Sequence, residues 1–175
     1  MLAWLGSAHG PATILGIGAT RDALVTSVLS RQKDALQGLA AAFVEDDPLV
    51  AARASAALRR LGLPGFSVVC GDAGQSDTYA GRVPADLILL GPDVVDGSQL
   101  RRRGLGEALS MLLTARGQLA WWSARDTPIA GWPQTLARAG LVALAGGRDW
   151  GFHRLVDRPR QLCDGVRLFP NSLPG

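Results

Sequence analysis

The chain has few of the residues from which disulfide scaffolds and metal sites are built. Its 175 residues include only two cysteines and two histidines. Cys70 and Cys163 lie far apart in the sequence and match no metal-binding or redox spacing. Nothing therefore indicates a disulfide framework or a metal site, and a reducing compartment is expected. We predict a cytoplasmic protein without a bound metal.

Long apolar runs and a strong excess of one charge are also missing. Residues 1–5 are apolar but carry no basic residue, and Gly6 and Gly10 make the run too short for a secretion signal or a membrane span. The 18 basic and 15 acidic residues leave a net charge of only +3. The dense basic run at residues 101–103 lacks the aromatic neighbours of a nucleic-acid surface. A solvated loop or helix start is the favoured interpretation of this run, and a phosphate-binding patch is the alternative. We predict neither a membrane nor a nucleic-acid partner.

The chain does contain an alternation of short apolar runs and helical stretches. Its length and its 47% apolar composition fit a single globular domain over residues 1–175. Apolar runs predict strands at residues 12–18, 39–44, 66–70, 86–90 and 118–122. Helical spacing predicts helices at residues 22–36, 48–61, 99–114 and 132–139. Two further strands, 150–156 and 166–169, follow each other without a helix between them.

Strands that alternate with helices predict a parallel sheet covered by helices on both faces. The last two strands predict an antiparallel hairpin at the sheet edge. The predicted fold class is therefore α/β, with a Rossmann-like, doubly wound, mostly parallel sheet and a C-terminal antiparallel hairpin. In such a sheet, ligands bind at the carboxyl ends of the strands.

A glycine turn follows the first predicted strand. Gly16 and Gly18 allow a tight turn and leave space for a ligand to approach the backbone. The following helix would present free N–H groups to that ligand. Many α/β proteins use glycine in this turn only to connect two elements, so the turn alone does not decide between binding and connection. A dinucleotide fingerprint would need a further glycine where Arg21 stands.

Acidic residues follow the second and third predicted strands. Glu45, and next Asp46, are placed to accept hydrogen bonds from ribose hydroxyls. Asp47 precedes Pro48 and can instead cap the next helix; both roles can coexist. After the third strand, Asp72 could accept from an exocyclic amine while the small Ala73 leaves room for a flat ring, although residues 71–74 also suit a plain turn. Together the three strand ends suit an adenosine-containing ligand.

Several segments resemble a group of actinobacterial-type class I S-adenosylmethionine-dependent methyltransferases. The resemblance is carried by residues 45–48, 71–81 and 83–90 and by the closing segments 151–156 and 165–169, and it extends over roughly residues 12 to 169. It implies S-adenosylmethionine held by the glycine turn, the acids and the small residue after the third strand, and the end of the fourth strand: Gly16, Gly18, Glu45, Asp46, Asp72, Ala73 and Gly91. Methyl transfer needs positioning and desolvation more than a particular catalytic side chain, so no catalytic residue is named.

The chain departs from the family pattern in three places. Thr20 stands where relatives carry another glycine, and the fourth strand ends in the unusual segment Gly91–Val95. Only about eleven residues precede the first strand, so we expect the N-terminal helices that cover the substrate side in relatives to be absent. The leading prediction is a methyltransferase for an unidentified small molecule. The alternative is a non-catalytic methyltransferase-fold protein that binds a partner through its exposed face. A homo-oligomer is also left open.

Other residues receive mainly structural predictions. His153 is expected to be a structural histidine in an edge strand, and His9 a solvated loop residue. Trp121 and Trp122 should point to opposite faces of their strand, so that one lies in the core and the other can reach the substrate side. Cys70 is predicted to pack in the core.

Overall fold

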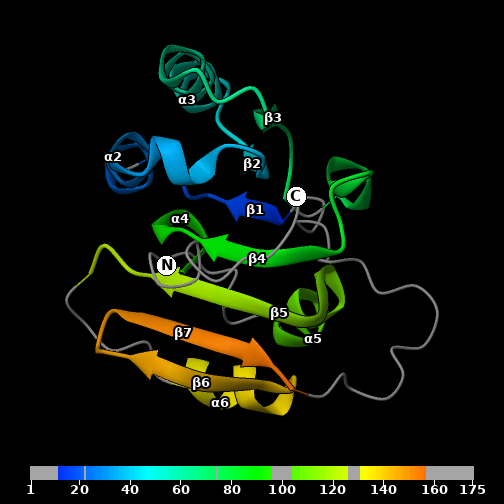
Figure 1. The fold of residues 1–175 in the computed structure, drawn as a ribbon. Helices are drawn as coiled ribbons and strands as arrows, with labels where there is room; N and C mark the ends of the chain where they lie inside the picture. The colour runs from blue at the N-terminus through cyan, green and yellow to red at the C-terminus, as the bar shows by residue number, and fades with distance from the viewer. Residues whose placement is uncertain (1–11, 22, 74, 96–103, 126–130, 157–175) are drawn as a thin grey trace.

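The strands of the chain form one twisted sheet with helices on both faces (Figure 1). The computed structural model describes residues 12–21, 23–73, 75–95, 104–125 and 131–156. Within these residues the sheet has seven strands in the order β3-β2-β1-β4-β5-β7-β6. The strands are β1 (Thr13–Ile17), β2 (Ala40–Glu45), β3 (Phe66–Cys70), β4 (Ala85–Leu90), β5 (Leu113–Trp122), β6 (Leu141–Gly146) and β7 (Trp150–Leu155). The helices are α2 (Ala23–Arg31), α3 (Pro48–Leu61), α4 (Pro92–Val95), α5 (Leu105–Leu112) and α6 (Trp132–Arg138), with 3-10 turns η1 (Lys33–Leu36) and η2 (Ser76–Tyr79).

The pairing of the strands confirms the predicted fold class. Strands β3, β2, β1, β4 and β5 are parallel, whereas β7 pairs antiparallel with both β5 and β6. The antiparallel hairpin of the structure is formed by β6 and β7, whereas the predicted one joined residues 150–156 to residues 166–169. Those four residues lie outside the described part of the chain.

Strand β6 was missed because its sequence, Leu-Val-Ala-Leu-Ala-Gly, is rich in residues that favour helices and has a single β-branched side chain. Its pairing with β7 overrides that local preference. Two helices are also shorter than predicted. Helix α2 ends at Arg31 before η1, and α5 ends at Leu112 because β5 already begins at Leu113.

Two hydrophobic cores fill the spaces between the sheet and its helices. On one face, Leu105 and Trp132 from α5 and α6 pack with β-strand residues such as Ile17 and Leu90. On the other face, Leu29 and Leu58 from α2 and α3 pack with a second set of side chains from the same strands. Successive residues of β1 and β2 alternate between the two clusters, as expected for a sheet buried on both faces.

Helix α3 begins and ends where the sequence predicts. Asp47 is its N-cap and accepts hydrogen bonds from the backbone N–H groups of Leu49 and Val50, at 2.8 and 3.3 Å. Pro48 occupies the first turn, where its missing N–H costs nothing. Gly62 ends the helix in the left-handed conformation at φ 66°. The predicted capping role of Asp47 is confirmed.

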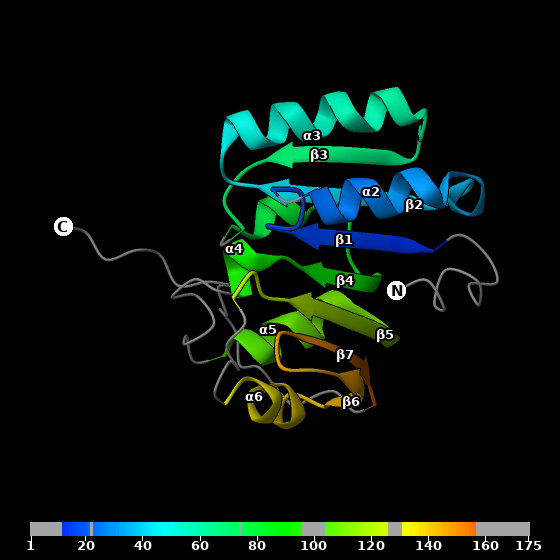
Figure 2. The same cartoon turned by 90° about the vertical axis from the view of Figure 1, so that its left-hand side faces the viewer.

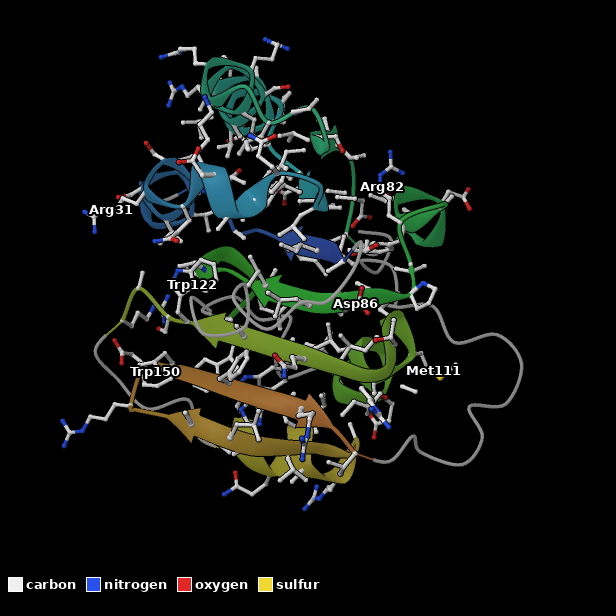
Figure 3. All side chains as sticks on the ribbon, viewed as in Figure 1. Arg31, Arg82, Asp86, Met111, Trp122 and Trp150 are labelled. Carbon is white, nitrogen blue, oxygen red and sulfur yellow. The ribbon has the colours of Figure 1, made fainter. Side chains whose placement is uncertain are left out.

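The amino-terminal ends of three strands are joined by one carboxylate. Asp86 in β4 accepts from the Thr13 backbone N–H at 3.0 Å and from the Thr114 hydroxyl at 3.1 Å (Figure 3). It thereby ties β1, β4 and β5 together at the edge opposite to the predicted ligand site. None of the helices within the described ranges is long and apolar enough to span a membrane.

Candidate functional site

The carboxyl ends of β3, β2, β1 and β4 meet at one edge of the sheet (Figure 2). Three backbone hydrogen bonds continue the sheet beyond the strands themselves. The N–H of Gly71 donates to the Glu45 carbonyl at 2.9 Å, and that of Gly18 donates to the Val44 carbonyl at 3.0 Å. The N–H of Gly91 donates to the Ile17 carbonyl at 3.0 Å. The turns after β3, β1 and β4 are therefore each hydrogen-bonded to the end of an adjacent strand at this edge.

Gly18 and Gly91 bring two of these turns into close contact. Gly18 has a positive φ of 56°, which favours glycine. A Cβ on Gly91 would lie 1.8 Å from the Gly18 carbonyl oxygen and 2.6 Å from the Ala19 Cα. Both contacts are with backbone, which cannot rotate aside. Gly91 is therefore required for the packing of the β4 turn on the β1 turn, whatever its contact with a ligand.

Core packing explains why glycine is needed at position 16. A Cβ at this position would meet the ring of Phe43, with 2.3 Å to Cδ1 and 2.7 Å to Cε1. Phe43 is buried between β2 and the helices α2 and α3. The space in front of Gly16 is therefore filled by core packing, and its cofactor-binding role stays a prediction.

Glu45 lies deeper than expected from its place in the sequence. It is the last residue of β2 and is only 1% exposed. Its Oε1 accepts two hydrogen bonds from Thr20, one from the backbone N–H at 2.8 Å and one from the hydroxyl at 2.7 Å. Thr20 itself is 9% exposed. The residue that replaces the expected glycine thus binds the very carboxylate predicted to hold a ribose.

This partnership could not be found by position alone, because residues 20 and 45 come from different turns. The signal present in the sequence is a hydroxyl in a loop that faces an acid on the neighbouring strand. The next acid, Asp46, is exposed at the same edge. Asp47 caps α3 and lies 3.7 Å from Arg21, a surface ion pair of small energetic weight.

The loop after β3 is braced by two side chains from η2. The Thr78 hydroxyl donates to the Asp72 carbonyl at 2.9 Å, and the Tyr79 hydroxyl donates to the Ala73 carbonyl at 2.6 Å. Tyr79 is 1% exposed, and burial, together with the Asp72 carboxylate, raises its pKa above the usual range. The phenol therefore stays protonated and keeps donating. The sequence did not predict these two hydrogen bonds. In the loop that they hold, Asp72 is exposed and Ala73 is half-buried.

Trp121 and Trp122 point to opposite faces, as predicted. Trp121 is buried, and its Nε1–H donates to Nε2 of His153 at 3.1 Å. Trp122 is half-buried on the other face, where it pairs across the sheet with Trp150 (Figure 3). His153 is 3% exposed, as expected of a structural histidine. The prediction for Cys70 was wrong, because it ends the edge strand β3 and is exposed.

Several other predicted residues fall outside the described part of the chain. They are His9, Arg101, Arg102, Arg103 and Cys163. Among the described residues, no three side chains of histidine, cysteine, aspartate or glutamate are grouped so as to hold a metal ion.

Comparison with solved structures identifies the architecture. A S-adenosylmethionine-dependent methyltransferase from Aquifex aeolicus superposes with a TM-score of 0.63 at 18% identity, over 89% of this chain and 87% of the other. The chain has the methyltransferase fold. Geranyl diphosphate C-methyltransferase from Streptomyces coelicolor, solved with S-adenosyl-L-homocysteine, matches at 0.61 and 12% identity, over 82% of this chain and 59% of the other.

The methyltransferase fold also occurs in a protein named for another reaction. The [4+2]-cyclase SpnF matches with a TM-score of 0.55 at 18% identity, over 78% of this chain and 54% of the other. This chain thus spans little more than half the length of SpnF and of the geranyl diphosphate enzyme. No known sequence family matches the chain, and no curated protein matches it either. At these identities the likeness shows the fold and leaves the reaction to be inferred from the site.

The His153–Trp121 pair makes stability depend on pH. Burial lowers the pKa of His153, and the Leu141 backbone only partly opposes this. Above pH about 6.5 both the folded and the unfolded chain keep this histidine neutral. Below that pH the unfolded chain takes up the proton and the folded chain does not, until the lowered folded pKa is reached. As the pH is lowered from about 6.5 toward the folded-state pKa of His153, the free energy of unfolding should therefore decrease, by at most about 1.4 kcal/mol per pH unit.

The measurement is urea unfolding at several pH values between 7 and 5, for the wild type and for His153→Phe. The variant should have a lower stability at pH 7, because Trp121 loses its acceptor, but a flatter dependence on pH. Equal slopes for the two proteins would show that His153 takes up its proton equally in the folded and unfolded states.

Proposed function

We propose that the chain binds S-adenosylmethionine at the carboxyl edge of the sheet and transfers its methyl group to a small-molecule acceptor. The observation that carries this proposal is the convergence of three strand ends on a methyltransferase fold. The glycine turn after β1, the acid that ends β2 and the Asp72–Ala73 turn after β3 lie side by side at that edge. This order of residue types suits an adenosine-containing ligand.

The proposed site residues differ in how they could contact the cofactor. Asp72 is exposed at a loop held by Thr78, and its carboxylate would accept from the adenine amine. Ala73 contributes a small, half-buried surface for the ring. The backbone of the Gly18 turn, fixed against Gly91, would line the rest of the cofactor. Glu45 would take the ribose position; both hydrogen bonds from Thr20 end on its Oε1, and neither reaches Oε2.

When bound, the cofactor supplies an electrophilic methyl group on a sulfonium. The contribution of the chain is to orient the ligand and to exclude water around it, for which the rigid turns after β1, β3 and β4 are suited. Two kinds of hydrogen bond hold these turns in place. The Tyr79 hydroxyl donates to the loop after β3, and the backbone N–H groups of Gly18, Gly71 and Gly91 donate to carbonyls of adjacent strands. This chemistry requires no nucleophile on the protein.

The test is isothermal titration with S-adenosylmethionine and S-adenosyl-L-homocysteine. We expect micromolar affinity for the wild type and at least about tenfold weaker binding for Asp72→Asn, because a charge-assisted hydrogen bond is lost. Asp34→Asn is the matched control. It makes the same change on η1, an exposed turn that leads into the amino end of β2, and should bind like the wild type.

Absence of heat at millimolar ligand would overturn the enzyme proposal. The chain would then be better described by the alternative, a non-catalytic protein of this fold that binds a partner. Equal affinity of Asp72→Asn and the wild type would mean that the ligand is held elsewhere.

We further propose a cytoplasmic site of action, supported by the cysteine usage of the chain. We also propose a second copy of the chain as partner, supported by the hairpin at the sheet edge. Val142, Leu144 and Trp150 on β6 and β7 are all more than 40% exposed, and β6 carries no charged residue. An uncharged edge strand beside exposed apolar side chains is suited to association.

A further inference from the structure

The single tyrosine of the chain connects the hydrophobic core to the loop after β3. Tyr79 is the only tyrosine in the sequence. Its ring belongs to the core on the α5 and α6 face of the sheet and is 1% exposed. Its hydroxyl donates to the Ala73 carbonyl at 2.6 Å. The core therefore holds this carbonyl through one side chain.

The hydroxyl of Tyr79 is not explained by core packing. A phenylalanine would fill nearly the same space, and burial of a hydroxyl group costs free energy unless the group is hydrogen-bonded. Packing alone would therefore favour phenylalanine at this position, and what tyrosine adds is the bond to Ala73. Burial, together with the Asp72 carboxylate, raises the pKa of the phenol, so that it keeps the proton that it donates.

Two consecutive carbonyls of the loop are held in different ways. The Asp72 carbonyl accepts from the Gln75 backbone N–H at 3.0 Å and from the Thr78 hydroxyl at 2.9 Å. The Ala73 carbonyl accepts from Tyr79 alone, as far as the described residues go. Loss of the Tyr79 hydroxyl would leave this carbonyl, on a half-buried residue, without that donor. Because an unpaired carbonyl is costly there, we expect its peptide group to rotate toward water.

We propose that Tyr79 is a positioning residue that sets the base selectivity of the cofactor site. The proposal rests on the proposed function, in which Asp72 accepts from the adenine amine and Ala73 contacts the ring. A purine makes both contacts only if the Ala73 surface and the Asp72 carboxylate are correctly separated. Tyr79 fixes that separation by holding the Ala73 carbonyl. Its own side chain is too deeply buried to contact the ligand.

The test compares the wild type and Tyr79→Phe for two ligands by titration calorimetry. The ligands are S-adenosyl-L-homocysteine and S-inosyl-L-homocysteine, in which a carbonyl oxygen replaces the amine. The wild type should prefer the adenine ligand by at least about tenfold, because a carboxylate accepts from the amine and repels the oxygen. In Tyr79→Phe this preference should fall to within about threefold, mainly through weaker binding of the adenine ligand.

Ser110→Ala is the matched control for the loss of a buried hydroxyl. Ser110 lies on α5, is fully buried and donates to the Glu107 carbonyl at 2.8 Å. This variant should lose stability and keep the ligand preference of the wild type. If Tyr79→Phe weakens both ligands by the same factor, or leaves the preference unchanged, Tyr79 has a structural role only and the proposal is overturned.

Asp72→Asn shows whether Tyr79 acts through the adenine contact. In that background, Tyr79→Phe should weaken the binding of S-adenosyl-L-homocysteine by less than about twofold, since the contact is already impaired. Fully additive losses would contradict the proposal. If Asp72→Asn binds like the wild type, the proposed function itself fails. If it binds more weakly while Tyr79→Phe keeps the full preference, only the role of Tyr79 fails.

A measurement on the wild type does not depend on how well Tyr79→Phe folds. Because the chain has one tyrosine, an isotopic label at the tyrosine Cζ gives a single NMR signal. If the hydrogen bond favours binding of the adenine ligand, that ligand must favour the hydrogen bond to the same extent. S-adenosyl-L-homocysteine should therefore shift the signal, and the inosine ligand should shift it less. Equal shifts, or no shift with either ligand, would overturn the proposal.

Discussion

Replacement of Gly91 by alanine should cost the chain about 3–5 kcal/mol of its free energy of unfolding. The added Cβ would lie 1.8 Å from the Gly18 carbonyl oxygen and 2.6 Å from the Ala19 Cα. Real atoms do not approach so closely, so the turn after β4 or the turn after β1 must shift. Such a shift also breaks the hydrogen bond from Gly91 N–H to the Ile17 carbonyl. A domain of this size has a total stability of about 5–15 kcal/mol, so the loss is a large part of it.

The measurement is urea unfolding followed by circular dichroism, with Gly38→Ala as the control. Gly38 has a φ of 85° and open space around its Cβ position, so its replacement introduces backbone strain of about 1–2 kcal/mol and no collision. Gly38→Ala shows what a glycine-to-alanine change costs without a collision, and Gly91→Ala should cost clearly more. If Gly91→Ala unfolds within about 1 kcal/mol of the wild type, the two turns do not touch as the structure places them.

The same contact explains why Gly91→Ala should affect ligand binding. The turns after β1 and β4 form neighbouring parts of the proposed site, and their separation is fixed by the absence of a side chain at Gly91. A displaced Gly18 turn would alter the surface offered to a cofactor. A change in ligand affinity in Gly91→Ala would therefore be explained by the packing of Gly91 on the Gly18 turn.

Much of this fold could be predicted from the sequence, because the signals are local. Strands β1 to β4 each combine a short apolar run with a nearby glycine, proline or acidic residue, as at Gly65 before β3 and Gly91 after β4. Strand β5 lacks such a boundary, and it begins at Leu113, directly after α5 and earlier than the predicted start at residue 118. The Asp47–Pro48 pair marks the start of α3 through capping chemistry that involves only neighbouring residues. Strand β6 could not be found in this way, since pairing with β7 decides its structure.

The candidate site was predictable in outline and not in detail. Position after a strand places Glu45 and Asp72 at the same edge, and this follows from the parallel topology. Whether a carboxylate there is open or occupied depends on side chains from other turns. Thr20 donates to Glu45, while Thr78 and Tyr79 hold the loop of Asp72, which is exposed. The sequence shows that these hydroxyl groups are present, but which backbone or carboxylate oxygen each one contacts depends on how the turns fold.

Gly16→Ala should destabilise the chain by about 1–3 kcal/mol, and the loss should be partly reversed when Phe43 is made smaller. The added Cβ would lie 2.3 Å from Phe43 Cδ1, and the ring, 1% exposed, is held against Phe66 with 6.4 Å between centroids. Phe43→Val alone should cost about 2–4 kcal/mol, because it leaves a void beside Gly16. In the double variant the new methyl group fills part of that void.

The double variant should therefore lose less stability than the sum of the two single changes, by about 1 kcal/mol or more. Gly16→Ala combined with Leu109→Ala is the control pair, because Leu109 is buried in the core on the opposite face of the sheet and the two costs should add to within about 0.5 kcal/mol. Additivity of Gly16→Ala and Phe43→Val would show that the two positions do not touch. Coupled costs, with unchanged affinity of folded Gly16→Ala for S-adenosyl-L-homocysteine, would assign Gly16 to packing. The cofactor contact of the β1 turn would then begin at Gly18, whose positive φ of 56° favours glycine.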